Sequence, residues 1–425
     1  MPQITFVIPA FNAASTLGDA VRSVLDQAGA DLELIVIDDG STDGTSRVAG
    51  SFSDPRVALV RRANRGVAAT RNLGLMMARG EFICFLDADD ALEPDFARAT
   101  LGAIGDCDAI ATAYRDTDPS LKPTQLVWCT AAEELLIHRL RETNPLALGA
   151  TVFRVDALHQ LAHVHGEVFP SDSHIEDWEM LLRFTALGGR WARPIDQPLM
   201  LCRMSAHSRS SKVLEIWKDG CEQIGRWVPR QEQTAALRRW TLRQLMRAVF
   251  AEQPQTIRSI QASLGELRET DTPVLSGMAR SLAERHAAAC GQNLSAAELA
   301  QRLSPLGSDL ASSLASRAFG PGWDELALRA AHTVSPQQRL VVYGFGRNGR
   351  EAARALVARS IPFATIDDDP ASHSPNRITI ADLGPRDVVV VTPDEQGPIL
   401  ARLKSVRVAA VLTAASLARP DAAAA

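Results

Sequence analysis

Three aspartates follow a short apolar run near residue 85. The run, Phe82–Leu86, has the length and bounding residues of a buried strand, and Asp87, Asp89 and Asp90 come directly after it. Open α/β sheets bind ligands at the carboxyl ends of their strands. The three carboxylates repel one another there, and a divalent cation such as Mg²⁺ or Mn²⁺ would offset that repulsion and bridge to phosphates. Aspartate also favours helix N-caps and turns, so this segment alone leaves both interpretations open.

The elements before this turn alternate between strand and helix. Strands are predicted at 4–9, 32–37 and 57–60, and helical spacing of apolar residues occupies 14–27 and 66–79. This alternation predicts βαβ units and a mostly parallel sheet, hence an α/β fold. A second acidic pair, Asp38 and Asp39, ends the second strand. We therefore expect the two acidic loops to converge on one crevice.

Bulk properties exclude several classes of protein. The 425 residues suffice for two or three domains, and the net charge of −5 argues against a nucleic-acid binder. The six cysteines include no CxxC pair, which favours reduced thiols over a disulfide framework or zinc site. Neither a basic leader nor an apolar stretch of membrane-spanning length is visible. We expect a soluble cytoplasmic protein.

Four blocks together resemble a known family. They are Val7–Asn12, Val36–Thr45, Asn64–Asn72 and Phe85–Asp90. In this order and spacing they resemble the family 2 glycosyltransferases, which are inverting enzymes with the GT-A fold. The resemblance covers residues 1–212, which it implies are a GT-A domain, a Rossmann-like mixed sheet with helices on both faces.

The resemblance also implies site roles. Asp89 would bind the metal and Asp87 would lie towards the ribose and sugar, as a DxD motif. Arg71 would border the nucleotide, although a helix-surface or ion-pair role is open for it. The remaining nucleotide contacts would be Pro9, Ala10 and Phe11 around the base, Asp39 on the base or ribose, and Asn64 and Gly66 beside the nucleotide.

The second half of this domain supplies a candidate base. Segment 173–183 resembles the Glu-Asp motif of the family at a helix start, where Asp177 would take the proton of the acceptor hydroxyl. Acidic residues also favour helix N-termini for electrostatic reasons alone. His207 is a candidate contact to the metal or diphosphate, or else a surface histidine. A helix is predicted over 126–141, a strand within 144–154, and a strand carrying His163 and His165.

Residues 213–335 read as a helical connector. A basic face near Arg238, Arg239 and Arg243 could touch an anionic membrane, as a lipid-linked acceptor would require. Residues 336–418 form a second α/β unit that resembles a small Rossmann-like domain, and 419–425 reads as a disordered tail. In this unit the strand 340–343 precedes a glycine-rich turn, with strands also predicted at 362–366, 387–392 and 406–412. Its ligand candidates are Gly344, Gly346, Gly349 and Asp367, for a dinucleotide or nucleotide sugar, unless the glycines serve only close packing.

These patterns predict a metal-dependent, inverting glycosyltransferase of bacterial-type glycan or glycoconjugate synthesis. The donor would be a nucleoside diphosphate sugar, most commonly a UDP sugar, and the cofactor Mn²⁺ or Mg²⁺. The acceptor would be a glycan, a lipid-linked molecule or a protein, with peripheral contact at the inner membrane face. Two alternatives are an inactive nucleotide-sugar-binding regulator and an NAD(P)-binding activity in the C-terminal unit.

Overall fold

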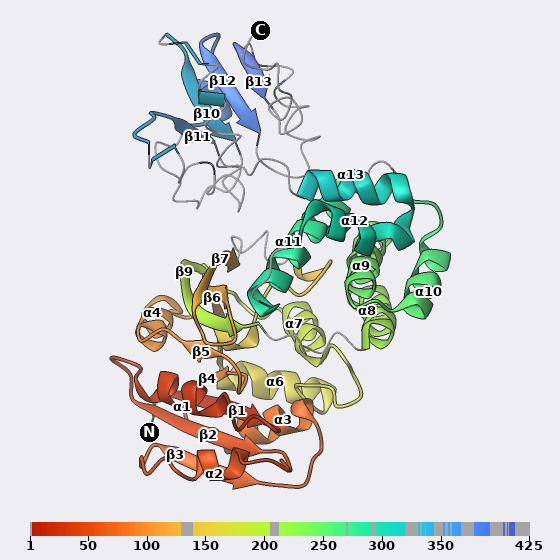
Figure 1. Cartoon of the computed structure of the whole chain (residues 1–425). Helices are drawn as coiled ribbons and strands as arrows, with labels where there is room; N and C mark the ends of the chain where they lie inside the picture. Colours follow the sequence, from red (N-terminus) through yellow and green to blue (C-terminus); the bar gives the residue numbers. More distant parts are fainter. Residues whose placement is uncertain are drawn as a thin grey trace. The chain divides into compact units, whose positions relative to one another are not determined.

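The computed structural model describes residues 2–128, 139–204, 212–268, 271–290, 294–318, 330–331, 334–335, 337–343, 352, 356–357, 359–366, 378–391, 403, 406 and 408–412. Internal contacts group the chain into two compact units (Figure 1). One contains Met1–Glu266 and Leu282–Leu294, and the other contains Leu267–Ser281 and Ser295–Ala425. The sequence instead divides the chain at residues 212 and 335, and those domain boundaries stay predictions.

The first unit is built on a nine-stranded mixed sheet of order β3-β2-β1-β4-β8-β6-β9-β5, with β7 paired to β6. The strands are β1 (Ile4–Ala10), β2 (Leu32–Asp38), β3 (Val57–Arg61), β4 (Phe82–Phe85), β5 (Ala91–Leu92), β6 (Ala109–Thr117), β7 (Pro123–Trp128), β8 (Thr151–Arg154) and β9 (Ile195–Arg203). The predicted α/β class is confirmed. Strands β1 to β4 are all parallel, as the alternation of strands and helices predicts.

Beyond β4 the sheet departs from the expected parallel order. Strand β8 pairs antiparallel with both β4 and β6, β5 pairs antiparallel with β9, and β6 pairs antiparallel with β7. Among the described strands of this half, only β6 and β9 pair in parallel. Antiparallel neighbours need no crossover helix, which is why the sequence of this half lacks a regular alternation.

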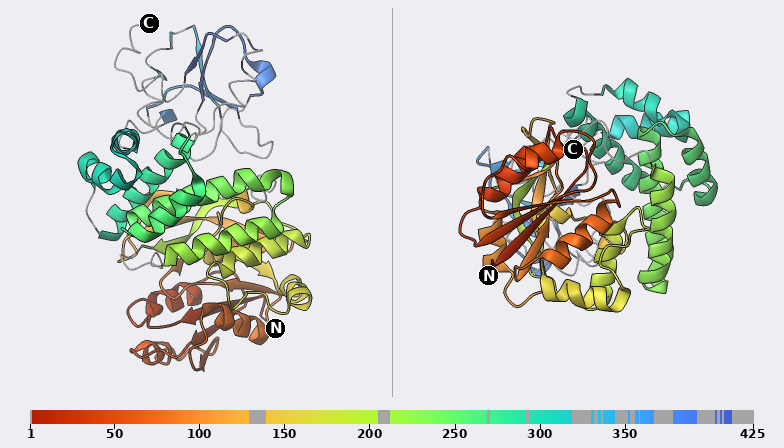
Figure 2. Two further views of the ribbon diagram at one scale, coloured as in Figure 1. Left: turned by 90° about the vertical axis from the view of Figure 1, so that its right-hand side faces the viewer. Right: turned by 90° about the horizontal axis from the view of Figure 1, so that it is seen from below.

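Helices cover both faces of the sheet (Figure 2). The apolar face of α1 packs with that of α4 on one side, whereas α3, α6 and α7 pack on the other, followed by α8 and α9. Strand β1 contributes side chains to both apolar clusters. Phe6 and Ile8 pack in the cluster with α1 and α4, and Val7 packs in the cluster with α3, α6 and α7. The helices are α1 (Leu17–Leu25), α2 (Thr45–Ala49), α3 (Val67–Met77), α4 (Phe96–Ala103), α6 (Val155–His165), α7 (Glu176–Ala186), α8 (Val213–Trp227), α9 (Arg230–Phe250), α10 (Pro254–Leu264) and α11 (Thr272–Cys290).

Two local predictions are corrected. His163 and His165 lie on helix α6 rather than on a strand, because Val155, Leu158 and Leu161 are buried at helical spacing. The helix predicted over 126–141 is wrong for residues 126–128, because these residues belong to strand β7, which pairs with β6. Residues 129–138 of that prediction lie outside the described residues.

The second unit contains a small sheet of four parallel strands in the order β11-β10-β12-β13. Its elements are α12 (Ala296–Leu303), α13 (Ser308–Ala318), β10 (Arg339–Tyr343), β11 (Ala364–Ile366), β12 (Asp387–Val391) and β13 (Ala410–Leu412). Arg339 at the start of β10 pairs with Asp387 at the start of β12, with Nε 2.7 Å from Oδ1. The four predicted strands are present, and the Rossmann-like assignment stays a prediction. Among the described residues, no helix is both long and apolar enough to cross a membrane.

A buried carboxylate, that of Glu33 near the start of β2, connects β2 to β1 and to the segment after α3. Glu33 accepts hydrogen bonds from the Thr5 hydroxyl and from the Arg79 main-chain N–H, both at 2.7 Å, and pairs with the Arg79 side chain. Burial alone would raise the pKa of Glu33, but these hydrogen bonds outweigh it and lower that pKa below 4.5. The ionised form is therefore the one that the fold stabilises.

Replacing this carboxylate with an amide, Glu33→Gln, is expected to lower the free energy of unfolding by about 2 kcal/mol at pH 7. Because the folded pKa is depressed, the wild-type advantage is present above pH 4.5 and is lost as the pH falls through the folded pKa. Urea unfolding at several pH values measures this difference. The matched control is Glu81→Gln at an exposed ion pair, which is expected to change little at any pH. A Glu33→Gln difference that grows as the pH falls below 4.5 would contradict the prediction.

Candidate active site

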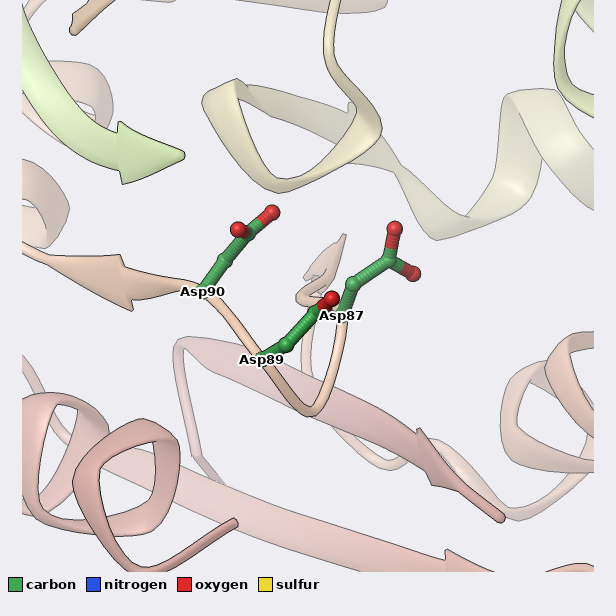
Figure 3. Close-up of side chains that lie close together, drawn as sticks. All are labelled: Asp87, Asp89 and Asp90. Carbon is green, nitrogen blue, oxygen red and sulfur yellow. The ribbon is translucent and has the colours of Figure 1, made fainter. Parts of the chain in front are cut away.

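The acidic turn after β4 gathers three carboxylates (Figure 3). One oxygen from each of Asp87, Asp89 and Asp90 can be chosen so that all lie within 4.8 Å of one another. Asp90 is buried, Asp87 is partly exposed and Asp89 is exposed. Burial, together with the negative charges of Asp89 and Asp87, raises the pKa of Asp90 well above its usual value. An all-oxygen donor set under mutual repulsion fits a hard divalent cation, so these residues suit the predicted metal.

Arg71 on α3 joins this turn to the start of α7. Its side chain is only 2% exposed, and its two terminal nitrogens donate to Asp87 Oδ1 at 2.7 Å and to Glu176 Oε1 at 2.8 Å. The guanidinium carbon also lies 5.6 Å from the centre of the Phe169 ring. Burial opposes the charge, yet Asp87 and Glu176 outweigh it and raise the pKa of Arg71. The described contacts of Arg71 are ion pairs, and its predicted place beside the nucleotide stays a prediction.

Asp177 is the second residue of α7 and is partly exposed. Its Oδ2 accepts a hydrogen bond of 2.9 Å from the Asn144 side-chain amide, and its Oδ1 accepts one of 2.7 Å from the Trp178 main-chain N–H. Trp178 is buried, and its indole N–H donates to the Leu140 carbonyl at 2.7 Å. The start of α7 is therefore anchored, and the Asp177 carboxylate is held in one orientation.

Asp39 shapes the loop that precedes α3. Its carboxylate accepts hydrogen bonds from the main-chain N–H groups of Arg65 and Gly66, the latter at 2.8 Å, and pairs with Arg62 at 3.0 Å. Gly40 has φ of +79°, and a Cβ there would lie 2.7 Å from the Asn64 nitrogen, so only glycine allows this close approach. The companion Asp38 is buried and accepts from the Ser41 main-chain N–H, which fits a supporting role in the loop.

The other predicted nucleotide contacts lie at the carboxyl ends of the parallel strands. Pro9 and Ala10 are buried at the end of β1, whereas the Phe11 side chain is 51% exposed. Asn64 and Gly66 are both exposed in the loop before α3. The Phe11 ring is therefore accessible, as its predicted contact with a base requires.

Several candidate residues lie outside the described part of the chain, namely His207, Gly344, Gly346, Gly349 and Asp367. Their roles stay predictions. The structure also adds residues for which no individual role is predicted from the sequence. Glu176 pairs with Arg71, Asn144 orients Asp177, and Arg203 contacts the acidic turn. In the sequence, Arg203 stands out merely as a charged residue at the end of the apolar segment Leu199–Arg203.

Comparison with known proteins assigns the family. The model described as Glycosyl transferase family 2 matches residues 5–159. An uncharacterized glycosyltransferase of Haemophilus influenzae is 42% identical over 185 residues, which are 43% of this chain and 71% of that protein. The chain therefore belongs to glycosyltransferase family 2.

Other similarities cover less of the compared proteins or are weaker. The succinoglycan biosynthesis protein ExoO of Rhizobium meliloti is 42% identical over 99 residues, 23% of this chain and 28% of that protein. The first three curated relatives are matched over only 28% to 41% of their own length. The crystal structure of S. aureus TarS 1-349 in complex with UDP-GlcNAc overlaps with a TM-score of 0.45 at 16% identity, over 74% of this chain and 90% of that one. At this TM-score the overlap says nothing about ligands of this chain.

Proposed function

We propose that the chain is a metal-dependent, inverting glycosyltransferase that moves a sugar from a nucleotide donor to an acceptor hydroxyl. The observation that carries this proposal is the buried Arg71, which bonds Asp87 of the acidic turn and Glu176 beside Asp177. The Arg71 guanidinium thus connects the acidic turn to helix α7, which presents the candidate base. Family membership and the oxygen-rich acidic cluster support the same reaction class.

Asp89 would hold the metal, with Asp87 and Asp90 completing the acidic site. A divalent ion bound there, Mn²⁺ or Mg²⁺, would stabilise the negative charge that develops on the leaving nucleoside diphosphate. Asp87 is itself held by Arg71, which fixes its carboxylate against the donor side of the turn. The turn follows β4 at the carboxyl edge of the sheet, where ligands of such sheets bind.

Asp177 would act as the general base. As the acceptor oxygen forms its bond to the anomeric carbon, the bond from that carbon to the diphosphate oxygen breaks, and Asp177 takes the hydroxyl proton. A single displacement of this kind inverts the anomeric centre. Asn144 orients Asp177 through the hydrogen bond to Oδ2, which positions the carboxylate before the acceptor arrives.

The nucleotide would lie across the ends of β1 and β2. Phe11 is exposed for contact with the base, next to Pro9 and Ala10. Asp39 already accepts main-chain hydrogen bonds, but a carboxylate has about four acceptor positions and could still accept from a base or ribose. Asn64 and Gly66 would flank the nucleotide from the loop that Asp39 orders.

His207 is proposed as a further contact to the metal or diphosphate. The Met204 main-chain N–H is fixed by a hydrogen bond of 3.1 Å to the Thr117 carbonyl. His207 follows Arg203 by four residues in the sequence, and the contact of Arg203 with the acidic turn supports this proposal.

The acceptor is proposed to be a glycan, a lipid-linked molecule or a protein. The matched relative ExoO is named for succinoglycan biosynthesis, which supports a glycan product. The arginines suggested for membrane contact make intramolecular contacts instead. Arg238 donates to the Leu264 and Glu266 carbonyls, and Arg239 pairs with Glu142. Membrane contact therefore gains no support from these residues.

A thermal-shift panel of UDP, GDP, dTDP and NAD, each with Mn²⁺ or with EDTA, tests the proposal. A ligand that binds only the folded state at about 100 times its Kd stabilises the fold by about 2.7 kcal/mol, a rise of a few degrees in Tm. We expect one nucleoside diphosphate, most readily UDP, to raise the Tm only with Mn²⁺. A response to NAD alone would contradict the proposal and move the ligand to the C-terminal unit, where β10 directly precedes the glycine-rich sequence that begins at Gly344.

A further inference from the structure

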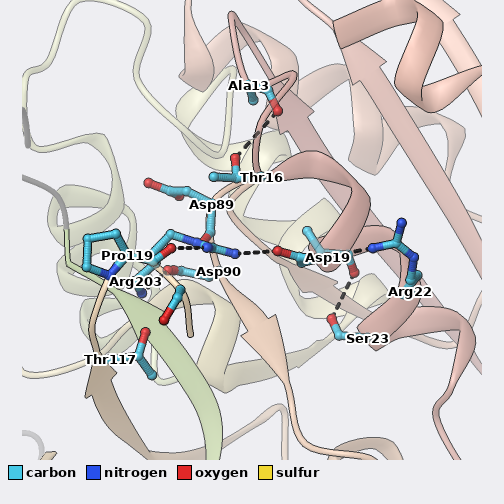
Figure 4. A network of polar contacts seen from close by, with 12 residues as sticks. Ala13, Thr16, Asp19, Arg22, Ser23, Asp89, Asp90, Thr117, Pro119 and Arg203 are labelled. Atoms are coloured by element: carbon cyan, nitrogen blue, oxygen red, sulfur yellow. Dashed lines mark hydrogen bonds and ion pairs between the residues drawn. The ribbon is translucent and has the colours of Figure 1, made fainter. Parts of the chain in front are cut away.

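Arg203, the last residue of β9, connects four segments of the first unit (Figure 4). Its Nε donates to the Asp89 main-chain carbonyl at 2.7 Å, and its own main-chain N–H donates to Asp90 Oδ1 at 2.8 Å. One terminal nitrogen pairs with Asp19 Oδ2 of α1 at 2.9 Å, and the other donates to the Pro119 carbonyl between β6 and β7. The side chain is only 8% exposed.

These contacts hold the backbone of the acidic turn. The guanidinium binds the main-chain oxygen of Asp89, and the N–H of the same arginine binds the side chain of the next residue, Asp90. The turn is thereby fixed at two consecutive residues. Arg71 holds a third residue of the turn through its hydrogen bond to Asp87. Three like charges within a few ångströms would otherwise separate, because each gains solvation by doing so.

We propose that Arg203 is a positioning residue of the metal site, which keeps Asp87, Asp89 and Asp90 gathered for a divalent cation. This inference rests on the proposed function. The ion pair with Asp19, whose side chain is 42% exposed, contributes little by itself, since exposed pairs are screened by water. The planar fork of donors matters more, because it reaches the carbonyls of Asp89 and Pro119 together.

The test measures Mn²⁺ affinity rather than turnover. In the full chain, the variants Arg203→Gln and Arg203→Lys are titrated with Mn²⁺ at saturating UDP, by calorimetry or thermal shift, and UDP binding is measured separately in EDTA. Residues that orient metal ligands typically change metal affinity about 10- to 100-fold when replaced. We expect the apparent Mn²⁺ affinity of Arg203→Gln to fall at least about tenfold. The affinity of Arg203→Lys should fall by a similar factor, because lysine lacks the planar fork of donors. A purely structural arginine would lower the Tm and leave Mn²⁺ affinity unchanged, which would overturn the proposal.

The matched control is Arg22→Gln. Arg22 pairs with the other oxygen of Asp19 at 3.1 Å and is exposed, so the same change of residue type is expected to leave Mn²⁺ affinity as in the wild type. If Arg203→Gln does not fold, Arg203→Lys decides, because it keeps the positive charge and removes only the planar fork. Unchanged Mn²⁺ affinity in Arg203→Lys would then overturn the proposal, and a weakened affinity would support it. Failure of the proposed function is distinguishable, since the wild type itself would then show no Mn²⁺-dependent response to UDP, GDP or dTDP.

Discussion

Asp89→Asn is expected to lower the rate of sugar transfer by about 10²–10³-fold and to abolish the effect of Mn²⁺ on nucleotide binding. Asp89 is the exposed member of the acidic cluster, and Asp87 is engaged by Arg71. Losing the Asp89 charge therefore removes the carboxylate best placed to bind a cation together with a nucleotide. Asparagine keeps the size of the side chain and relieves repulsion, so the fold is not expected to lose stability. The measurements are initial rates with a nucleotide sugar and Mn²⁺ titrations with the matching nucleoside diphosphate.

The control for this variant is Asp95→Asn. Asp95 lies just before α4, has a side chain that is 48% exposed, and forms a local ion pair with Arg98 at 2.7 Å, so it has the same chemistry outside the cluster. Its replacement is expected to leave rate and metal response unchanged. Asp89→Asn with wild-type transfer and wild-type Mn²⁺ response would refute the metal assignment and leave the acidic turn as a structural feature only.

The first half of the sheet was predictable from the sequence. Buried parallel strands are continuous apolar runs, and the turns that follow them contain the acids. Phe82–Phe85 shows both signals, and Leu32–Asp38 shows them apart from Glu33, so the placement of Asp39 and Asp87 at one edge followed from the parallel order of these strands. The family blocks added roles that topology alone does not assign.

The second half could not be predicted in the same way. The two residues of β5 are too few for any periodicity, and β9 finds its place only through partners far along the chain. The Arg71–Glu176 pair joins positions 105 residues apart, and the bond from Arg203 to Asp89 spans 114. Such links depend on tertiary packing, because neither partner shows a local pattern that identifies the other.

Asp177→Asn is expected to lower kcat by about 10²–10⁴-fold, because the amide cannot take the proton of the acceptor hydroxyl during attack. Binding of the nucleotide and its Mn²⁺ response should stay as in the wild type, since the hydrogen bonds of Asp177 to the Asn144 amide and the Trp178 main-chain N–H lie outside the acidic turn. The measurements are kcat with saturating donor and acceptor, and nucleotide binding by thermal shift. The combination of lost turnover with intact donor binding separates a base from a metal ligand.

The competing explanation is that Asp177 only stabilises the helix start. An acid in the first turn of a helix contributes about 0.3–1 kcal/mol, and its loss would lower the Tm slightly while leaving kcat almost unchanged. The matched control is Asp172→Asn, which replaces an exposed acid before the same helix and shows how much such a substitution alone changes the Tm and kcat. The neighbouring variant Asn144→Ala sharpens the comparison. It keeps the carboxylate but removes the hydrogen bond at Oδ2, so a positioned base should lose part of its rate whereas a helix-stabilising acid should not.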